Sequence, residues 1–279
     1  MLKQRIVTAL ILAPLFLWAL FGLSPQYFSG VIGGVVVLAG WEWARMAGLT
    51  VQWQRVLYAL TLVPALVLVA HRQPETVLAA ALLWWVIAAV LVKLYPVSAH
   101  AWRNRGLRLA VGYLILVPTW VAVTGLRQAD WSTLGVGPEH AAWLLLYSLA
   151  IVWCADVGAY FAGKALGRHK LAPRVSPGKS IEGAVGGLAA VGIFASAVGG
   201  GWLALEGTRL MVWVGVALGC GVISILGDLM ESLAKREAGI KDSSALLPGH
   251  GGVLDRIDSI TASSPLFLFA ALQLGWVQL

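Results

Sequence analysis

Long apolar runs alternate with short polar segments along nearly the whole chain of 279 residues. A helix needs about 20 mostly apolar residues to cross the hydrocarbon core of a bilayer. The runs are continuous rather than alternating, which excludes the strands of a membrane β-barrel. We therefore predict an all-α polytopic membrane protein with about nine transmembrane helices, at residues 5–23, 28–47, 55–71, 76–95, 107–126, 140–163, 181–204, 209–230 and 260–278.

The polar segments divide the predicted helices into two regions. Residues 1–126 hold the first five helices, and residues 127–279 hold the last four together with two long polar loops, 164–180 and 231–259. We expect catalysis in the second region. The first apolar run has no evident small-residue cleavage site, which favours a retained helix over a signal peptide.

Charge predicts how the chain crosses the membrane. Only 12% of residues are charged, against about 25% in soluble domains. The net charge of +7 is explained by the positive-inside rule, so we expect no nucleic-acid partner. All Lys and Arg residues except Arg72, Arg127 and Arg209 fall on one side, which predicts a cytoplasmic N-terminus, a C-terminus on the opposite side, and two cytoplasmic polar loops.

The densest polar stretch follows the eighth run and reads SLAKREAGIKDSSALLPGHGGVLDRID from Ser232 to Asp258. On a helix Asp228, Glu231, Ser232 and Lys235 share one face. Asp228 lies within the apolar run, where an unpaired carboxylate is costly, so we assign it a function. For Glu231, a salt bridge to Lys235 and a functional role fit the pattern equally well.

Two more carboxylates lie at the other end of this stretch. Asp255 and Asp258 point the same way on a helix, while Arg256 points elsewhere. Two carboxylates in one turn repel unless a cation lies between them. With Asp228 they predict an oxygen site for magnesium, which typically takes one or two carboxylates plus substrate phosphates and water. Acidic capping of a helix explains Asp258 but not the whole cluster.

The turn between these acids is glycine-rich. Gly251 and Gly252 fit either a plain turn or a backbone that binds phosphate through its N–H groups. His250 between the glycines is equally compatible with a structural role and with a phosphate or substrate contact.

The other long loop, 164–180, is strongly basic. Its GKS ending resembles a P-loop, but Pro173 replaces the required glycine and no strand precedes it, so we reject that motif. Orientation alone needs fewer charges, and we expect this loop to bind a polyanion such as a nucleotide triphosphate or a lipid phosphate. Ser176, Lys179 and Ser180 are the best contacts, because Lys and hydroxyls at a helix start suit phosphate.

Two acids lie inside other apolar runs. Glu42, between Trp41 and Trp43, fits a structural role at an interface. Asp156 has a stronger claim to function, because Tyr160 and Lys164 follow it at helical spacing toward the basic loop.

The polar positions of the long stretch occur in a fixed order, namely Ser232-x-x-Lys235-Arg236, Lys241-Asp242, His250-Gly251-Gly252 and Asp255-Arg256-x-Asp258. This order resembles the signature of the phosphatidate cytidylyltransferases (CDP-diacylglycerol synthases). Ala234 departs from it, since the family usually has a larger aliphatic residue there. The resemblance extends from Asp156 to Gly183, and the number and placement of spans agree with bacterial members.

The resemblance implies a membrane enzyme of phospholipid biosynthesis that makes CDP-diacylglycerol and pyrophosphate from CTP and phosphatidic acid with magnesium. It implies that Asp228 and Asp255 hold the metal, that a monovalent cation such as K⁺ lies nearby, and that the chain forms a homodimer. We expect the protein in the lipid bilayer of a bacterial-type inner membrane, with its active site facing the cytoplasm.

We assign roles to the remaining polar residues from the chemistry of such a transfer, which needs mainly positioning of the substrates and neutralisation of their charge. We expect the phosphates to be clamped by Lys179, Lys235, Arg236, Lys241 and Arg256. Ser232, Gly251 and Gly252 complete the substrate contacts. Asp242 and His250 are further catalytic candidates, although the attacking phosphate, with a second pKa of about 6, needs no dedicated base.

Two alternatives, another membrane enzyme that uses CTP and a transporter, predict different observables. A polyprenol kinase that uses CTP would release CDP rather than pyrophosphate. A cation-coupled transporter with Asp156 and Asp228 as ion sites would depend on a gradient and not on CTP. The DGxxAR-type motif expected of a CDP-alcohol phosphotransferase does not occur in the sequence.

Overall fold

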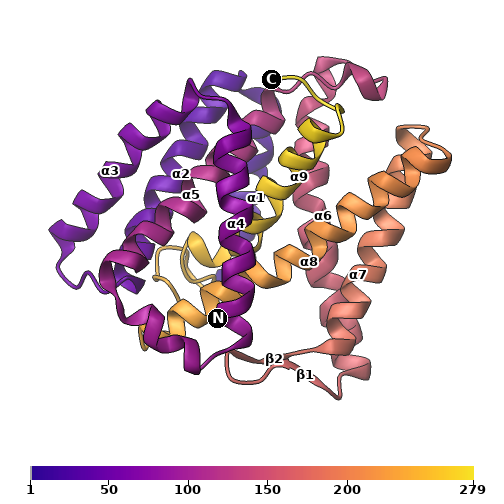
Figure 1. Ribbon diagram of the computed structural model, residues 1–279. Coiled ribbons are helices and arrows are strands. Elements are labelled where there is room, and N and C mark those ends of the chain that lie inside the picture. Colours follow the sequence, from indigo (N-terminus) through magenta and orange to yellow (C-terminus); the bar gives the residue numbers. More distant parts are fainter. Residues whose placement is uncertain (1) are drawn as a thin grey trace.

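The structure is a computed structural model that describes residues 2–279, with side chains described from Gln4 onward. Nine long helices account for most of this part of the chain (Figure 1). They are α1 (Leu2–Gly22), α2 (Pro25–Met46), α3 (Gln52–Ala70), α4 (Pro74–Lys93), α5 (Arg105–Gln128), α6 (Ala141–Leu166), α7 (Ile181–Ser196), α8 (Gly207–Glu237) and α9 (Leu254–Gln273). The predicted all-α polytopic architecture is confirmed.

Eight helices in the described part of the chain are long and apolar enough to cross a membrane. The ninth predicted span corresponds to α9, which begins at Leu254 rather than near residue 260 and is not among these eight. Its polar residues Ser259, Thr261, Ser263 and Ser264 are buried. The helix α9 packs against α4, α5, α6 and α8. Because its side chains face protein rather than lipid, they do not all need to be apolar.

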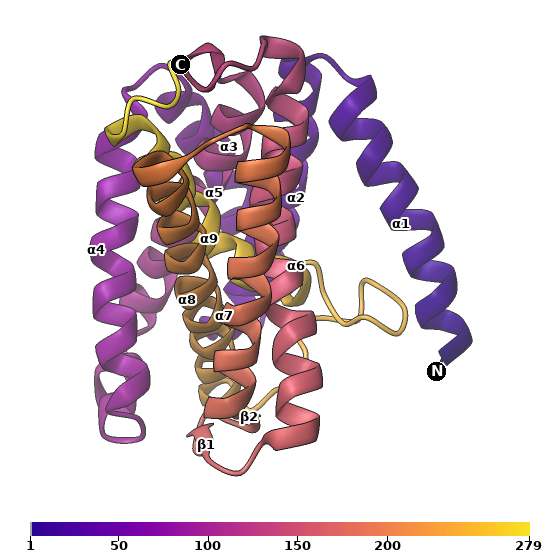
Figure 2. The same cartoon turned by 90° about the vertical axis from the view of Figure 1, so that its right-hand side faces the viewer.

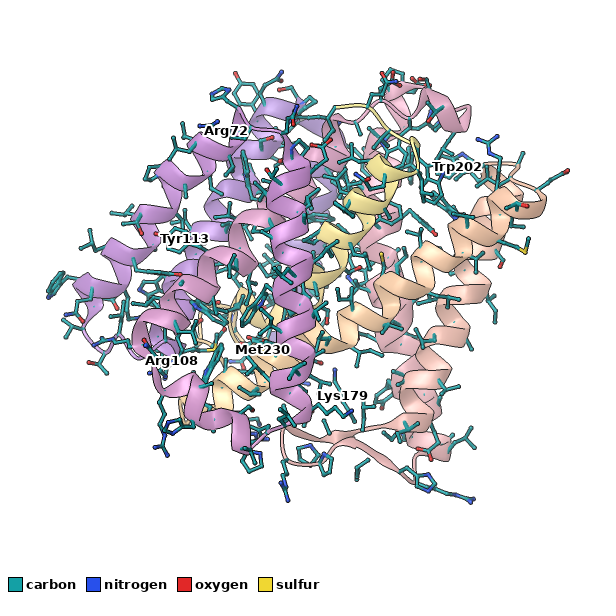
Figure 3. The ribbon with its side chains drawn as sticks, in the orientation of Figure 1. Arg72, Arg108, Tyr113, Lys179, Trp202 and Met230 are labelled. Atoms are coloured by element: carbon teal, nitrogen blue, oxygen red, sulfur yellow. The ribbon has the colours of Figure 1, made fainter. Side chains whose placement is uncertain are left out.

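The helices place the two chain ends at opposite ends of the bundle. The N-terminus lies toward the same end as the β1–β2 hairpin, and the C-terminus lies at the other end (Figure 2). Arg108 and Lys179 lie toward the hairpin end, whereas Arg72 lies toward the C-terminal end (Figure 3). This separation follows the predicted charge asymmetry. Which end faces the cytoplasm stays a prediction.

Short elements join the helices. The basic loop, predicted without regular structure, forms an antiparallel hairpin of β1 (Lys170–Ala172) and β2 (Ser176–Ser180). The 3₁₀ turns are η1 (Val97–Arg103), η2 (Ser132–Leu134) and η3 (Pro138–His140), and a π-helical turn, η4 (Ala197–Trp202), follows α7.

Close packing of α6 on α7 depends on small residues. A Cβ on Gly158 would stand 2.8 Å from the carbonyl oxygen of Gly186, and a Cβ on Gly187 would stand 2.5 Å from that of Ala155. Small residues allow helix backbones to approach closely in membranes, where lipid supplies no hydrophobic drive for association. This packing fixes the end of α6 against the start of α7, where the hairpin is attached.

Candidate functional site

The site is built where α8 and α9 cross. A Cβ on Gly227 would stand 2.6 Å from the carbonyl oxygen of Asp258 and 3.1 Å from the Cα of Ser259. Glycine therefore lets the two backbones touch at this point. As a result Asp228 and Asp258 lie close enough for their charges to interact.

Asp228 joins α8 to the basic hairpin. Lys179 Nζ lies 2.6 Å from Asp228 Oδ2, and the Ser232 hydroxyl donates to Asp228 Oδ1 at 3.2 Å. The Lys179 and Asp228 side chains remain 25% and 31% exposed, so a water-soluble substrate can reach both. The ion pair thus joins the first long polar segment to α8 just ahead of the second.

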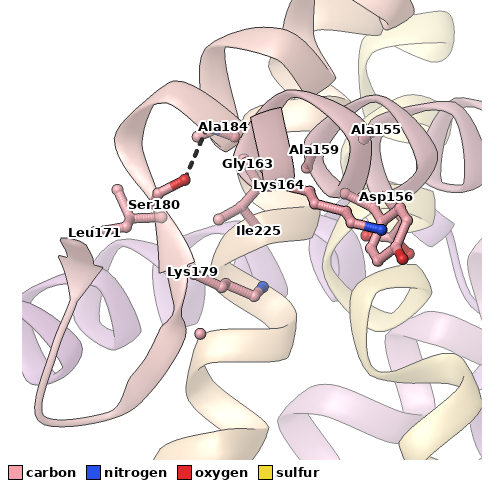
Figure 4. A pocket seen from close by; sticks show the side chains of 13 residues that line it. Ala155, Asp156, Ala159, Gly163, Lys164, Leu171, Lys179, Ser180, Ala184 and Ile225 are labelled. Carbon is pink, nitrogen blue, oxygen red and sulfur yellow. Dashed lines mark hydrogen bonds between the residues drawn. The ribbon is translucent and has the colours of Figure 1, made fainter. Parts of the chain in front are cut away.

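A cavity of about 380 Å³ opens beside the pair, between α6, α7, α8 and the hairpin. Asp156 and Lys164 from α6 lie around it with Lys179 and Ser180 (Figure 4). Asp156 is near enough to Lys179, Asp228 and Arg256 for their charges to interact. The structure therefore brings Asp156 and Arg256 toward the same acidic and basic cluster.

The hairpin is held at both ends. Ser180 caps α7, since its hydroxyl accepts a hydrogen bond from the N–H of Gly183 at 3.1 Å. This agrees with the helix start predicted near Ser180. Glu182 accepts from the backbone N–H groups of Arg168 and His169 and lies 2.6 Å from His169 Nδ1. Arg236 on α8 donates to the carbonyl of Val175 at 3.3 Å. These bonds fix the position of Lys179 relative to α8.

Lys235 links α8 to the start of α9. Its Nζ lies 3.2 Å from Glu231 Oε2 and 2.7 Å from Asp255 Oδ1. Asp255 Oδ2 also accepts from Ser243 N at 2.9 Å, Ser243 Oγ at 2.8 Å and Gly252 N at 2.7 Å. The Lys235, Glu231 and Asp255 side chains are only 15%, 4% and 5% exposed. This cluster therefore organises the loop before α9.

The sequence predicts only a structural role for Glu42 at an interface, but in the structure Glu42 holds the loop that precedes α9. It is fully buried, and its Oε1 accepts from Ser244 Oγ at 2.6 Å and Val253 N at 2.9 Å. Its Oε2 accepts from Leu254 N at 2.6 Å and lies 3.2 Å from Ser243 Oγ. The sequence signal for this role was a carboxylate inside an apolar run, but the sequence did not show which residues the carboxylate would bind.

The two loop glycines make room for carboxylates. Gly251 has a φ of +80°, and a Cβ there would stand 2.6 Å from Asp255 Oδ2. A Cβ on Gly252 would overlap Ser243 Oγ and Glu42 Oε1. Both glycines are thus required by the packing of the loop, and their predicted phosphate contact stays a prediction.

The other predicted residues lie around this core. Lys241 and Asp242 are exposed in the loop, and Ser176 begins β2. His250 donates its backbone N–H to Leu247, and its ring Nδ1 is buried without a hydrogen-bond partner among the described residues. Its predicted substrate contact is compatible with that open nitrogen and stays a prediction.

The acidic positions offer oxygen donors to a cation. Asp228 already holds an ammonium group at 2.6 Å, and Glu231 Oε1 is buried without a partner in the described part of the chain. No three His, Cys, Asp or Glu side chains of residues 2–279 converge as a metal cluster. This donor set fits magnesium, which takes few carboxylates and completes its shell with water and phosphates.

Comparison with known proteins covers the whole site. The sequence matches the family described as "Cytidylyltransferase family" over residues 3–274. It is 49% identical over 278 residues, 99% of each chain, to the phosphatidate cytidylyltransferase of Pseudomonas aeruginosa. It is 40% identical over 285 residues to that of Haemophilus influenzae, covering 96% of this chain and 98% of the relative. The similarity therefore includes α1 and α2 as well as the polar loops.

Proposed function

This chain belongs to the cytidylyltransferase family, and we propose that its reaction takes place at the Lys179–Asp228 pair, close to Asp258. It is an integral membrane nucleotidyltransferase that transfers CMP from CTP to phosphatidic acid, giving CDP-diacylglycerol and pyrophosphate. One substrate is an amphiphile and the other a soluble polyanion, so a cluster at the hairpin end of the bundle suits both.

The transfer is a displacement at phosphorus. An oxygen of the phosphatidate phosphate forms a bond to the α-phosphorus of CTP, and the bond from that phosphorus to the bridging oxygen of the β-phosphate breaks. The electron pair leaves with pyrophosphate. The attacking phosphate is already largely ionised at neutral pH, since the second pKa of a phosphate monoester is about 6, so the residues need to position and neutralise rather than remove a proton.

Basic side chains from three elements supply that neutralisation. Lys179 of β2 lies at the Asp228 carboxylate, and Arg256 of α9 lies near Asp156. Lys235 is fixed between Glu231 and Asp255, so its ammonium acts from a preset position. Groups held in place before reaction stabilise developing charge without the cost of reorganisation.

Asp228, Asp255 and Asp258 are the proposed magnesium ligands. Asp228 and Asp258 lie close enough for their charges to interact. Asp255 Oδ2 has three donors, whereas Oδ1 has only the Lys235 ammonium, so Oδ1 is the atom with capacity for a cation. Bound magnesium would neutralise the triphosphate and the departing pyrophosphate. A neighbouring K⁺ and a homodimer also remain proposals, based on the family resemblance.

The location follows from the helices. The protein is a multi-pass membrane protein, and we place it in a bacterial inner membrane with the hairpin end toward the cytoplasm, because the basic residues gather there. CTP is a cytoplasmic metabolite, which agrees with that orientation.

The observation that carries the proposal is the Lys179–Asp228 pair, which joins the basic hairpin to α8 in a chain related to these enzymes over its full length. The test uses purified protein in detergent with labelled CTP, phosphatidic acid and magnesium. We expect a labelled CDP-lipid and one pyrophosphate per turnover. Release of CDP would instead indicate a CTP-dependent kinase, and no CTP-dependent product would sink the proposal.

A further inference from the structure

A second cavity, of about 720 Å³, lies between α4 on one side and α7 and α8 on the other. Its walls are mainly aliphatic, and residues 171–175 of the hairpin line it. The hairpin lies below the lower end of α4 (Figure 1). Val222, Ile225, Leu226 and Leu229 line it from α8 at spacings of three and four, so they form one stripe along the helix. Val222 is 55% exposed, so the stripe is open to the surroundings at that end.

The lower end of this groove is basic. Lys93 at the end of α4 and Arg174 in the hairpin turn both line it, and both side chains are exposed. Basic side chains at the level of a membrane surface attract anionic lipid headgroups. An apolar groove with two cations at one end therefore has the charge pattern of an acidic lipid.

The groove also adjoins the cavity beside Asp156. Leu171, Ala184 and Ile225 line both spaces. On α8 the stripe from Val222 to Leu229 covers about 10 Å. Asp228 lies on this same stretch of the helix, and Ser232, one turn beyond it, donates to its carboxylate. An acyl chain along the stripe would thus place its headgroup at the level of the reacting groups.

We propose that this groove receives phosphatidic acid from the bilayer, with an acyl chain along the α8 stripe and its phosphate passing Lys93 and Arg174 toward Asp228. The assignment rests on the proposed function and adds the route of the lipid to it. The two substrates then reach α8 from two adjoining cavities, the lipid from the α4 side and the nucleotide from the α6 side.

The test compares two exposed valines. Val222→Trp fills the groove, whereas Val86→Trp adds the same bulk to α4 at a residue, 64% exposed, that does not line it. With dioleoyl phosphatidic acid in mixed micelles we expect Val222→Trp to raise the KM for phosphatidate about tenfold and to leave the KM for CTP unchanged. With a short-chain phosphatidate the difference should disappear, and Val86→Trp should match the unchanged protein throughout.

A second variant works through charge rather than bulk. Arg174→Gln should raise the KM for both long- and short-chain phosphatidate, because the headgroup contact is lost in each case. An unchanged phosphatidate KM in both Val222→Trp and Arg174→Gln would overturn the groove assignment, as would a change only in oligomeric state. Absence of any CDP-lipid from the unchanged protein would refute the proposed function instead.

An independent observation concerns Glu42, whose carboxylate has four donors within hydrogen-bond distance, all from residues 243–254. Two are the backbone N–H groups of Val253 and Leu254 at the start of α9, where a helix end has unsatisfied donors. The Ser243 hydroxyl lies between Glu42 and Asp255, 3.2 Å from one carboxylate and 2.8 Å from the other.

We infer that Glu42 is a positioning residue, which sets the start of α9 and hence the placement of Asp255 and Asp258. It acts from α2, and Arg45 one turn further on donates to the carbonyl of Ser243 at 3.2 Å. Glu42→Gln keeps the shape but replaces one oxygen with an NH₂ group. Each oxygen faces a backbone N–H, which cannot reorient to accept, so the amide must leave one N–H without its bond.

We expect Glu42→Gln to lower kcat about tenfold or more with less than about a twofold change in either KM, and to raise the magnesium concentration needed for half activation. Ser244→Ala removes a single donor and should give a smaller fall in kcat, which keeps the inference testable if Glu42→Gln folds poorly. Wild-type kcat and magnesium dependence in folded Glu42→Gln would overturn it. So would a loss of thermal stability in both variants with unchanged kinetics.

Discussion

Two ion-pair clusters near the site share the same residue types but differ in access to water. The Lys179–Asp228 pair is about a quarter to a third exposed, whereas Lys235, Glu231 and Asp255 are nearly buried. A triphosphate can displace the first pair without opening the loop, but it must break several hydrogen bonds to displace the second. The exposed fraction of the side chains thus separates a pair that a soluble substrate reaches directly from a cluster that is held in place by the loop around it.

Asp228→Asn tests this separation. The variant keeps the side-chain volume but removes the charge opposite Lys179, so we expect CDP-diacylglycerol formation to fall about 100-fold or more. Transfer of label from CTP into lipid measures the rate, and a thermal melt shows that the fold is kept. Asp130→Asn, an exposed change in the segment between α5 and α6, is the control and should react normally; near-normal turnover by Asp228→Asn would remove the assignment.

At the scale of helices, the crossing of α8 and α9 depends on one residue without a side chain. Gly227 contacts the backbone of Asp258 and Ser259 closely enough that no Cβ fits. Asp228 on α8 and Asp258 on α9 flank this contact. The separation of the helices therefore sets the separation of the carboxylates.

Gly227→Ala should move the two helices apart. Insertion of a methyl group against backbone typically costs about 1–3 kcal/mol, and we expect both the melting temperature and the turnover to fall. Gly215→Ala, on the same helix with nothing near its Cβ position, should keep both. Full activity and stability in Gly227→Ala would show that the crossing tolerates a wider spacing.

The helices themselves were largely predictable, because run length and composition are properties of neighbouring residues. The hairpin was not, since strands of three and five residues leave too short a pattern to recognise. The start of α9 was also misplaced toward residue 260, because its charged first turn resembles a loop in a hydropathy pattern.

At the scale of the whole molecule, the nine long helices of residues 2–279 place the two ends of the chain on opposite sides (Figure 2). The basic residues gather at the end that carries the hairpin, where Lys179 and Arg174 line the two adjoining cavities. Both substrates are anionic, so the charges that orient the protein also surround its site.

Cysteine labelling tests the orientation. In a chain whose Cys154 and Cys220 are replaced by alanine, a membrane-impermeant maleimide should label Gln278→Cys in intact spheroplasts. His100→Cys, in the segment between α4 and α5, should be labelled only after the membrane is opened, because we place that end in the cytoplasm. The reverse pattern would invert the topology.

The sequence by itself determined the helical membrane architecture, the polar stretch and the shared face of Asp228, Ser232 and Lys235, because each depends on residues close together in the chain. Only the tertiary structure decided that Lys179 meets Asp228, that Glu42 holds residues 243–254 from α2, and that two cavities adjoin at α8. Those contacts join segments that are far apart in the chain, so they depend on how the helices pack. Small residues such as Gly227 permit this packing, but the spacing of residues along the chain does not specify it.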